Sequence, residues 1–559
     1  MMRQKNFVLC IIYMASLLLF GGFYAWNITA LGVLVCLGFG SYLHGKKQGF
    51  HGASFWIHRI PAGIFLFQIA VTFWAVDKTA HLQGIIQGAV LLIWMRFCFQ
   101  EEESYRACVL DAIPRLGCCM VIICGACYFI PTLGSLFWRA ERLGGFFQYA
   151  NTCALFFLLG LVILSEKWLE GISDGSGKDR WMDFFQLMIL AVGILLTGSR
   201  SILLLTIFWG IYKGIGNRRF RKRFLGILLP LLLFMLMFFF LTGEGTQNIT
   251  RIFTMFTASS TLWGRLLYDI DGLSILAAHP MGLGYSGYYY VQHALQTGVY
   301  TTRFVHNDFL QIGLDYGIFP MILFAVYMIW QIVWGKQSKK KKELLVLIAL
   351  ASLVDFHLQY LAISFLAVLC LDPGERKKRQ GRGERLENQI GLLLLAVTFV
   401  ILTVPYFAAY RGNYEMTLKF LPCHTDGLVA ELEKETDKDK AVILAKNILS
   451  HNAYLSDAYN VMGFAAMMDG DPEGMMECQD QVLRLERYDV NRYRIYDELL
   501  QQYEQQLLQN LPQKDGESQE ETIRQIETKR ENIKEQLLAL REVTNPIAYR
   551  LRDVPQYKW

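Results

Sequence analysis

Apolar runs alternate with short polar connections along most of the chain. One stretch, from Leu344 to Leu371, is interrupted by Asp355 and His357 and is too long for a single helix. We predict two short crossings or a re-entrant hairpin there. The other runs have the length at which an α-helix crosses a bilayer, and they lie at about residues 6–24, 28–43, 60–76, 83–99, 112–131, 151–168, 182–198, 201–216, 224–242, 318–334 and 390–410. This pattern predicts an all-α polytopic membrane protein of about 12–13 transmembrane helices.

Composition supports this class and excludes others. Hydrophobic residues make up 53% of the chain and charged residues only 18%, which is more apolar than a soluble protein. The net charge of +5 comes from basic residues in short loops between apolar runs, so we interpret it as a topology signal and expect no nucleic-acid partner. The 12 cysteines lie mostly inside apolar runs and lack the spacing of a metal site or a disulfide framework.

Three basic segments predict the orientation in the membrane. They are Arg218–Arg223, Lys336–Lys342 and Arg376–Arg385. All three can be cytoplasmic together only if the N-terminus is inside and the polar interval at 243–306 is outside. The tail after Tyr410 is then extracytoplasmic too.

The chain divides into four predicted parts. N-terminal transmembrane helices occupy residues 1–139, a transmembrane core with a large external loop at 243–306 occupies 140–371, a basic loop and the last span occupy 372–413, and a helical tail occupies 414–559.

The tail has the pattern of a helical-repeat domain. Leu455–Asp489 resembles one tetratricopeptide-type hairpin, and helices at about 437–450 and 491–510 are expected to stack on it. Gln519–Arg541 has a narrow apolar stripe, which fits either a coiled coil or a helix packed on the preceding hairpin.

The polar interval Gly243–Gly317 is the longest between strongly apolar segments. It contains HPMGLGYSGYYY (His279–Tyr290) and FVHNDFLQIGLDYG (Phe304–Gly317), which are rich in glycine and aromatic residues. Long loops of this composition between rigid helices often carry functional sites, although such a loop can also simply connect two helices. The glycines allow tight turns, but no βαβ unit surrounds them, so they do not form a dinucleotide motif.

Four basic groups fall at one predicted face of the membrane: Arg142, Arg200, Arg265 and His306. Arginines at this depth often only reach toward the headgroups. Arg200, however, lies in the tight turn TGSRS between two apolar runs, where a guanidinium suits a two-pronged contact with phosphate. A loop histidine is often only a surface residue, but His306 and Asn307 directly precede a predicted helix, and an imidazole can take a proton from a hydroxyl near neutral pH.

At these residues the chain resembles the O-antigen ligase and O-antigen polymerase family. The resemblance covers about residues 140–371 and rests on five motifs in order, with a helical tail added that simple ligases lack. They are RLGGFFQYAN (Arg142–Asn151), TGSRS (Thr197–Ser201), LWGRLLYD (Leu262–Asp269), HPMGLGYSGY and VHNDFLQIGLDYGIFP (Val305–Pro320).

The resemblance implies a transferase in the bacterial cytoplasmic membrane. It implies a glycan donor carried on undecaprenyl diphosphate, a glycan, lipid or protein acceptor hydroxyl at the outer face, and neither a metal nor another cofactor. Arg200 and Arg265 would hold the diphosphate, and His306 would act as general base or orient the acceptor. The expected substrate-binding residues are Arg142, Asn151, His279, Gly282, Gly284, Tyr285 and Asn307.

Two other functions stay open from the sequence. A glycolipid flippase or transporter would favour charges deep inside several spans and internal repeats. A membrane-anchored scaffold would place the activity in the tail. For the transferase, we expect the tail to position the acceptor without taking part in the chemistry.

Overall fold

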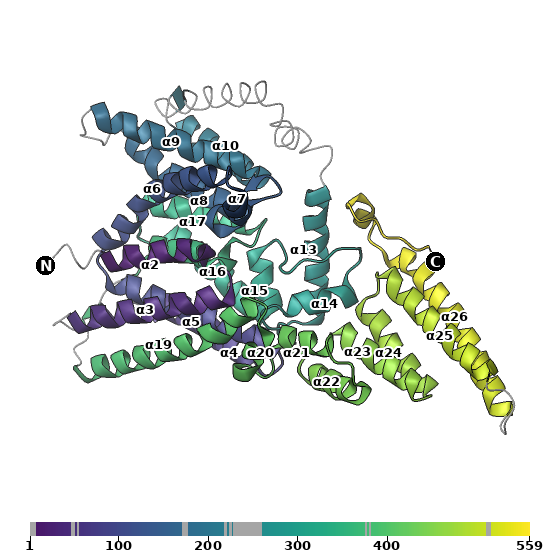
Figure 1. The fold of residues 1–559 in the computed structure, drawn as a ribbon. Coiled ribbons are helices and arrows are strands. Elements are labelled where there is room, and N and C mark those ends of the chain that lie inside the picture. Colours follow the sequence, from purple (N-terminus) through teal and green to yellow (C-terminus); the bar gives the residue numbers. More distant parts are fainter. Residues whose placement is uncertain are drawn as a thin grey trace.

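The computed structural model describes residues 7–45, 51–52, 55–169, 177–216, 221–222, 226, 260–374, 377–378, 382–509 and 516–558. The fold is all-α, as predicted, and it belongs to a polytopic membrane protein (Figure 1). The strands that occur are two residues long and form two antiparallel pairs. These are β1 (His51–Gly52) with β4 (Lys377–Lys378), and β2 (Trp138–Arg139) with β3 (Arg142–Leu143).

Helices of the N-terminal part and the core follow the predicted spans closely. In chain order they are α2 (Phe7–Leu18), η1 (Phe20–Gly22), α3 (Ala25–Gly45), α4 (Phe55–Val71), α5 (Lys78–Gln100), α6 (Glu103–Cys127), α7 (Pro131–Phe137), η2 (Gly145–Phe147), α8 (Ala150–Leu169), α9 (Gly177–Thr197), α10 (Arg200–Gly216), α13 (Ser260–Ala278), α14 (Gly287–Leu295), α15 (Asp308–Tyr316), α16 (Ile318–Trp334), α17 (Lys339–Ser352), η3 (His357–Gln359), α18 (Leu361–Cys370) and α19 (Arg382–Tyr410).

Length and composition qualify four of these helices as membrane spans: Ala25–His44, Lys78–Gln100, Glu103–Cys127 and Leu386–Tyr410. Shorter apolar helices, including Ile318–Trp334 and Leu361–Cys370, lie among them. The run predicted at 224–242 falls outside the described residues, apart from residue 226. The total number of crossings therefore stays a prediction.

The centre of the bundle is formed by helices that are apolar on every side. Residues 153–165 of α8 and all ten residues of α18 are buried. A helix without a polar face cannot border water, so such sequences belong in the interior. Helix α8 packs against α6 and α9, while α18 packs against α5 and α17.

The interrupted stretch Leu344–Leu371 lies in two helices, which fits both predicted alternatives, two short crossings and a re-entrant hairpin. Helix α17 ends at Ser352, a turn carries Asp355, and η3 leads into α18. The basic residues that begin α17 and the buried Asp355 lie at opposite ends of this helix, roughly 20 Å apart at 1.5 Å per residue. The carboxylate therefore lies near the end of α17 opposite its basic N-terminus.

The predicted external loop at 243–306 is largely helical where it is described. Residues 243–259 lie outside the described part, but α13 and α14 occupy most of 260–295. Apolar residues such as Leu267 and Ile275 give α13 a buried face against its neighbours, so this part of the predicted external loop is folded into helices. Its position outside the membrane stays a prediction. Helix α13 lies at the junction between the bundle and the tail (Figure 1).

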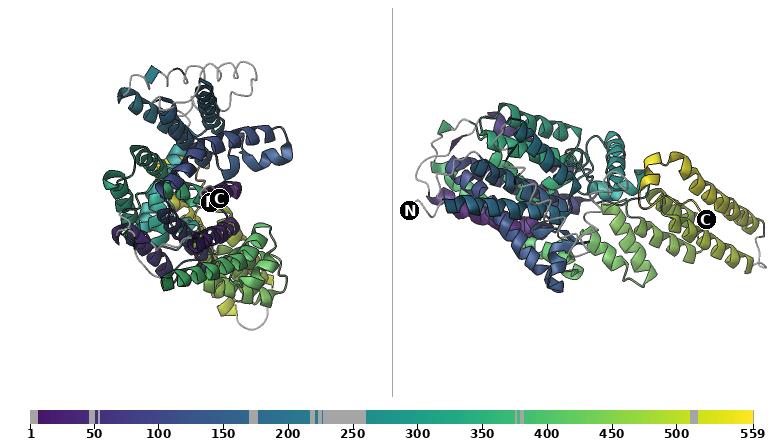
Figure 2. Two further views of the ribbon diagram at one scale, coloured as in Figure 1. Left: turned by 90° about the vertical axis from the view of Figure 1, so that its left-hand side faces the viewer. Right: turned by 90° about the horizontal axis from the view of Figure 1, so that it is seen from above.

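The tail forms a helical array that projects from the end of the bundle opposite the N-terminus (Figures 1 and 2). The predicted hairpin is α23 packed on α24, with α22 and α25 as neighbours. Ile526, Ile533 and Leu537 of α26 are buried with Tyr496 of α25, so the apolar stripe packs on the preceding helix. The tail elements are α20 (Tyr414–Phe420), α21 (Thr425–Leu432), α22 (Lys438–His451), α23 (Ser456–Met468), α24 (Pro472–Leu485), α25 (Val490–Gln509), α26 (Gly516–Val543) and η4 (Pro546–Arg550).

Candidate functional site

Asp355 lies at the centre of a buried polar cluster. Its side chain has 0% exposure. The Oδ1 atom accepts a hydrogen bond from the Tyr149 hydroxyl at 2.9 Å and lies 3.0 Å from His306 Nδ1. The Oδ2 atom accepts from Asn151 Nδ2 at 2.6 Å and from an Arg265 terminal nitrogen at 2.9 Å. We call these five residues the Asp355 cluster; it joins segments that are far apart in the sequence.

The hydrogen bonds of the Asp355 cluster define its protonation. A carboxyl group that receives hydrogen bonds from a guanidinium, an amide and a hydroxyl is favoured as a carboxylate, which can only accept. His306 Nδ1 must then carry its hydrogen and donate it to Asp355. The Nε2 atom of neutral His306 is left with the lone pair, which can accept a proton.

Packing and a helix cap fix the His306 ring. The ring stacks on Tyr268 with a centroid separation of 5.9 Å and contacts Phe356 at 5.1 Å. The next residue, Asn307, caps α15, because its side-chain oxygen accepts from the backbone N–H groups of Phe309 and Leu310. His306 is thus held at the start of a helix with 19% of its side chain exposed.

Arg265 has a donor to spare. One terminal nitrogen binds Asp355, while Nε is buried and has no hydrogen-bond partner among the residues that the structure describes. The side chain is 17% exposed. A buried donor without a partner is costly, so this atom is suited to an anionic ligand.

Asp269 lies one helical turn after Arg265 on α13. Burial raises the pKa of this carboxyl to about 6, even though His306, Arg265 and a hydrogen bond with Asn307 act in the opposite direction. Its Oδ1 atom is buried without a hydrogen-bond partner in the described part of the chain. A carboxyl group that changes charge near neutral pH therefore adjoins the Asp355 cluster.

Arg142 connects the Asp355 cluster to the TGSRS turn. Its Nε donates to the Thr197 carbonyl at 2.8 Å, and a terminal nitrogen donates to Asn151 Oδ1 at 2.8 Å. Gly198 has a positive φ of 59°, which allows the tight turn before α10. Arg200 is the first residue of α10, and the N-terminus of a helix attracts anions. The structure thus brings Arg142, Asn151, Arg265 and His306 together, with Arg200 on the adjoining turn.

The segment from His279 to Gly287 takes a different position. The backbone N–H groups of Leu283 and Gly284 donate to the carbonyls of Leu314 and Asp315 at 2.7 and 2.9 Å. Gly282 has a φ of 86°, and a Cβ there would lie 2.6 Å from the Gly317 nitrogen. The turn therefore packs tightly against the end of α15.

Tyr285 and Gly284 face the α4–α5 connection. Tyr285 is 1% exposed and its N–H donates to His81 Nδ1 at 3.0 Å, while a Cβ on Gly284 would lie 2.7 Å from Ala75 Cβ. His279 is half-buried at the end of α13. These observed contacts explain the turn by packing, and a substrate contact for its residues stays a prediction.

Sequence reasoning did not select three residues that the geometry brings forward: Asp355, Tyr149 and Asp269. An isolated acid inside an apolar stretch is a strong signal of a functional group at membrane depth, and Asp355 met that criterion. Tyr149 and Asp269 lie inside motifs already chosen, but only the fold shows that their side chains meet His306 and its partner.

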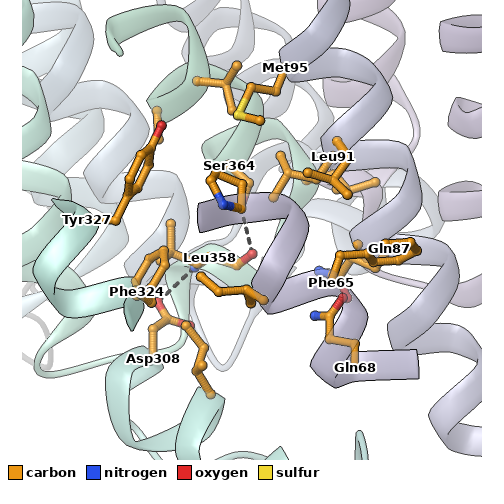
Figure 3. A pocket seen from close by; sticks show the side chains of 18 of the residues that line it. Phe65, Gln68, Gln87, Leu91, Met95, Asp308, Phe324, Tyr327, Leu358 and Ser364 are labelled. Atoms are coloured by element: carbon orange, nitrogen blue, oxygen red, sulfur yellow. Dashed lines mark hydrogen bonds between the residues drawn. The ribbon is translucent and has the colours of Figure 1, made fainter. Parts of the chain in front are cut away.

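An apolar cavity of about 190 Å³ lies beside η3 and the start of α18, next to Leu358 and Asp308 (Figure 3). It lies between α4, α5, α16 and α18. Asp308 and Gln359 line it near η3, and Asp308 Oδ2 accepts from the Leu358 N–H at 2.8 Å. Leu91 and Met95 line its apolar part (Figure 3).

Comparison with known proteins finds a similarity in the part of the chain that carries Arg265 and His306. Residues 185–325 match a family model described as O-Antigen ligase, while no curated protein and no solved structure matches the chain. The matched residues include Arg200, Arg265 and His306, and the other members of the Asp355 cluster flank them in sequence and meet them in space. Residues 185–325 therefore form a region of this membrane protein that is similar to the O-antigen ligase family.

Proposed function

We propose that this protein transfers a glycan from an undecaprenyl-diphosphate carrier to an acceptor hydroxyl at the outer face of the cytoplasmic membrane. The match of residues 185–325 to the O-antigen ligase family supports glycan ligase or polymerase activity in general. The observation that carries the finer proposal is that Asp355 joins His306 and Arg265. A proton acceptor and an anion-binding group thus share one buried carboxylate.

In the proposed reaction, the acceptor oxygen attacks the anomeric carbon of the donor sugar. The acceptor proton passes to His306 Nε2, and Asp355 stabilises the resulting imidazolium through Nδ1–H. The bond between the anomeric carbon and the diphosphate oxygen breaks, and its electron pair leaves with the diphosphate. Arg265 and Arg200 neutralise the charge that develops there.

The position of Arg265 suits this role. Its terminal nitrogen is held by Asp355 at 2.9 Å, and its Nε remains available for a phosphate oxygen. A guanidinium can donate to two partners in fixed directions, which an ammonium group cannot reproduce. Arg142 and Asn151 support the site by tying the TGSRS turn to Asp355.

The apolar cavity behind η3 supports a lipid-linked donor. Its lining is mostly aliphatic and aromatic, and it adjoins the segment that carries Asp355. A polyprenyl chain that approaches laterally between helices could place its first units there while the diphosphate reaches Arg265. We assign the cavity to the part of the lipid nearest the diphosphate.

We further propose that the site and the tail face the outside of the cell. The basic residues that begin α17 lie at the opposite end of that helix from Asp355, as the positive-inside rule requires. Cys423 is exposed in the tail. In intact cells, an impermeant thiol reagent should label a variant in which Cys423 is the only cysteine. It should not label a variant in which all native cysteines are replaced and Lys339→Cys supplies the only thiol.

One experiment tests the reaction itself. Purified protein is incubated with a defined undecaprenyl-diphosphate oligosaccharide, with and without a separate acceptor, and the products are analysed. Longer lipid-linked chains identify a polymerase, and transfer only in the presence of the acceptor identifies a ligase. Absence of any transferred glycan, or equal transfer by His306→Ala, contradicts the proposal. Movement of the intact glycolipid across the membrane would instead identify a flippase.

A further inference from the structure

The end of the tail packs on the helix that carries Arg265. The Asn545 N–H donates to the Thr297 carbonyl at 2.9 Å, which fixes the start of η4 beside the bundle. Ala548 of η4 and Leu267 of α13 are both 0% exposed and share a small apolar cluster with Tyr300. The C-terminal segment thus contributes directly to the surroundings of α13.

The contact is close along its length. A Cβ on Gly298 would lie 2.7 Å from Ala548 Cβ, so this position has no room for a larger residue. The Arg550 guanidinium lies over the Trp263 ring at 4.3 Å from its centroid, a cation–π arrangement. Leu551 reaches Gly264, the residue just before Arg265. The segment therefore covers the first half of α13.

Helical geometry separates the two faces of α13. Residues three or four apart lie on the same side of a helix. Trp263 and Leu267 are four apart and face the tail, whereas Arg265 and Asp269 are four apart and face His306 and Asp355. The tail therefore contacts one face of α13, and those contacts help to position Arg265 and Asp269 on the other face.

The second half of α13 has its own support. Ile275 and Leu276 are buried with Leu310 and Leu314 of α15. Gly272 allows Leu310 to approach closely. These contacts hold the helix after Asp269, so the tail contacts act on the half that begins before Arg265.

We propose that Asn545–Leu551 is a positioning element that holds Arg265 against Asp355. The role in catalysis rests on the proposed function, because that function assigns the diphosphate to Arg265. This proposal changes the expectation for the tail. Loss of the tail should weaken binding of the glycan donor. An acceptor-binding tail alone would leave donor binding intact.

The tail also docks to the bundle at separate points, so the segment can be tested without detaching the domain. Thr79 Oγ1 donates to the Cys423 carbonyl at 2.7 Å, and the Thr425 hydroxyl bonds to Asp77. His293 Nδ1 lies 3.5 Å from Glu486 on another face. A point change in η4 leaves these contacts in place.

The test uses the full chain with Ala548→Asp, which places a charge against Leu267 and Tyr300. The matched control is Tyr549→Asp at the adjacent position, where the side chain is 43% exposed. Hydrogen exchange of residues 260–270 should become about tenfold faster or more in Ala548→Asp, since an unpaired buried charge weakens local structure. Exchange at 308–316 and in the control should stay near the parental rate. The milder Leu551→Ala should show a smaller change of the same kind.

A second readout separates positioning from general damage. Ala548→Asp should weaken donor binding about tenfold in the parental background and have little further effect in Arg265→Ala, because the two changes act on one interaction. Its acceptor KM should be unchanged. Unchanged exchange at 260–270, or an equal loss of donor binding in the Arg265→Ala background, overturns the proposal. If hydrogen exchange at 260–270 rises but the parental protein transfers no glycan, Asn545–Leu551 still supports α13, and the proposed reaction is contradicted.

Discussion

His306 Nδ1 lies 3.0 Å from Asp355 Oδ1, and the other oxygen of the same carboxylate holds Arg265 at 2.9 Å. One buried acid therefore orients the proposed base and anchors the proposed phosphate ligand. A change at Asp355 must affect both halves of the reaction, whereas a change at His306 affects only proton transfer.

Asp355→Asn should lower turnover by roughly 10²- to 10⁴-fold, the range associated with loss of general-base catalysis. The amide keeps the shape but no longer stabilises an imidazolium at His306, and Arg265 loses its charged partner. Donor binding should weaken as well, unlike in His306→Ala. Steady-state kinetics with separate donor and acceptor titrations measure both effects.

The matched control for that change is Asp372→Asn. Asp372 is a buried acid that accepts from the backbone N–H groups of Lys336 and Gly374, and it lies beyond the opposite end of α18 from Asp355. Asp372→Asn should leave turnover, donor binding and acceptor KM near the parental values. Parental turnover in a folded Asp355→Asn protein would show that the carboxylate does not serve His306.

The sequence was most informative where the bilayer restricts which secondary structure a segment can adopt. A segment such as Ile318–Trp334 has to be a helix because no water is present to satisfy its backbone, and prediction and structure agree on its bounds. The break between two helices at Asp355 and His357 could also be predicted, because polar residues are rare inside apolar stretches of this kind. Residues 260–295 were expected to be a loop, since polar composition hides the apolar face of α13 when its partners in the tail are unknown.

Chemistry was predictable by residue type and less so by contact. Arginine and histidine at one membrane face suggested phosphate binding and proton transfer, and the fold brings Arg265 and His306 together. Their shared partner comes from a different helix pair, a relationship that no local spacing encodes. The opposite case is Tyr285, whose glycine-rich surroundings suggested a ligand loop but form a packed turn.

Arg265→Lys should separate stability from donor binding. Arg265→Ala leaves Asp355 without its cation, and breaking a buried ion pair in this way costs about 3–5 kcal/mol. Lysine keeps a positive charge near Asp355 and should recover part of the thermal stability. It should not recover donor affinity, because one ammonium group cannot bind the carboxylate and a phosphate in the fixed geometry of a guanidinium.

Thermal unfolding and donor binding of the two variants provide the measurement. Arg411→Lys is the control, since Arg411 is exposed at the end of α19. If lysine restores full donor affinity, Arg265 acts only as a point charge and the two-pronged contact is wrong.

Asp269→Asn should change how stability depends on pH. Burial raises the pKa of Asp269 from 3.8 to about 6, so the folded protein binds this proton more tightly than the unfolded chain. The stability that Asp269 contributes is then present below about pH 4 and is lost as the pH rises through about 6. The asparagine variant cannot ionise. Its melting temperature relative to the parental protein should therefore increase between pH 4 and pH 7, and a constant difference over this range would contradict the assignment.

Leu91→Trp should weaken the binding of donors that carry a prenyl chain. Leu91 lines the cavity behind η3, and the larger indole would fill part of its volume of about 190 Å³. Donors with a full undecaprenyl chain and with a short prenyl chain should both bind more weakly, because both carry the units nearest the diphosphate. A donor with a methyl group in place of the prenyl chain should be affected less. The control is Leu393→Trp on α19, where the side chain is 58% exposed on the outside of the bundle. Equal loss with the prenyl donors and the methyl donor would place the lipid chain elsewhere, because a filled cavity discriminates only against the part of the ligand that enters it.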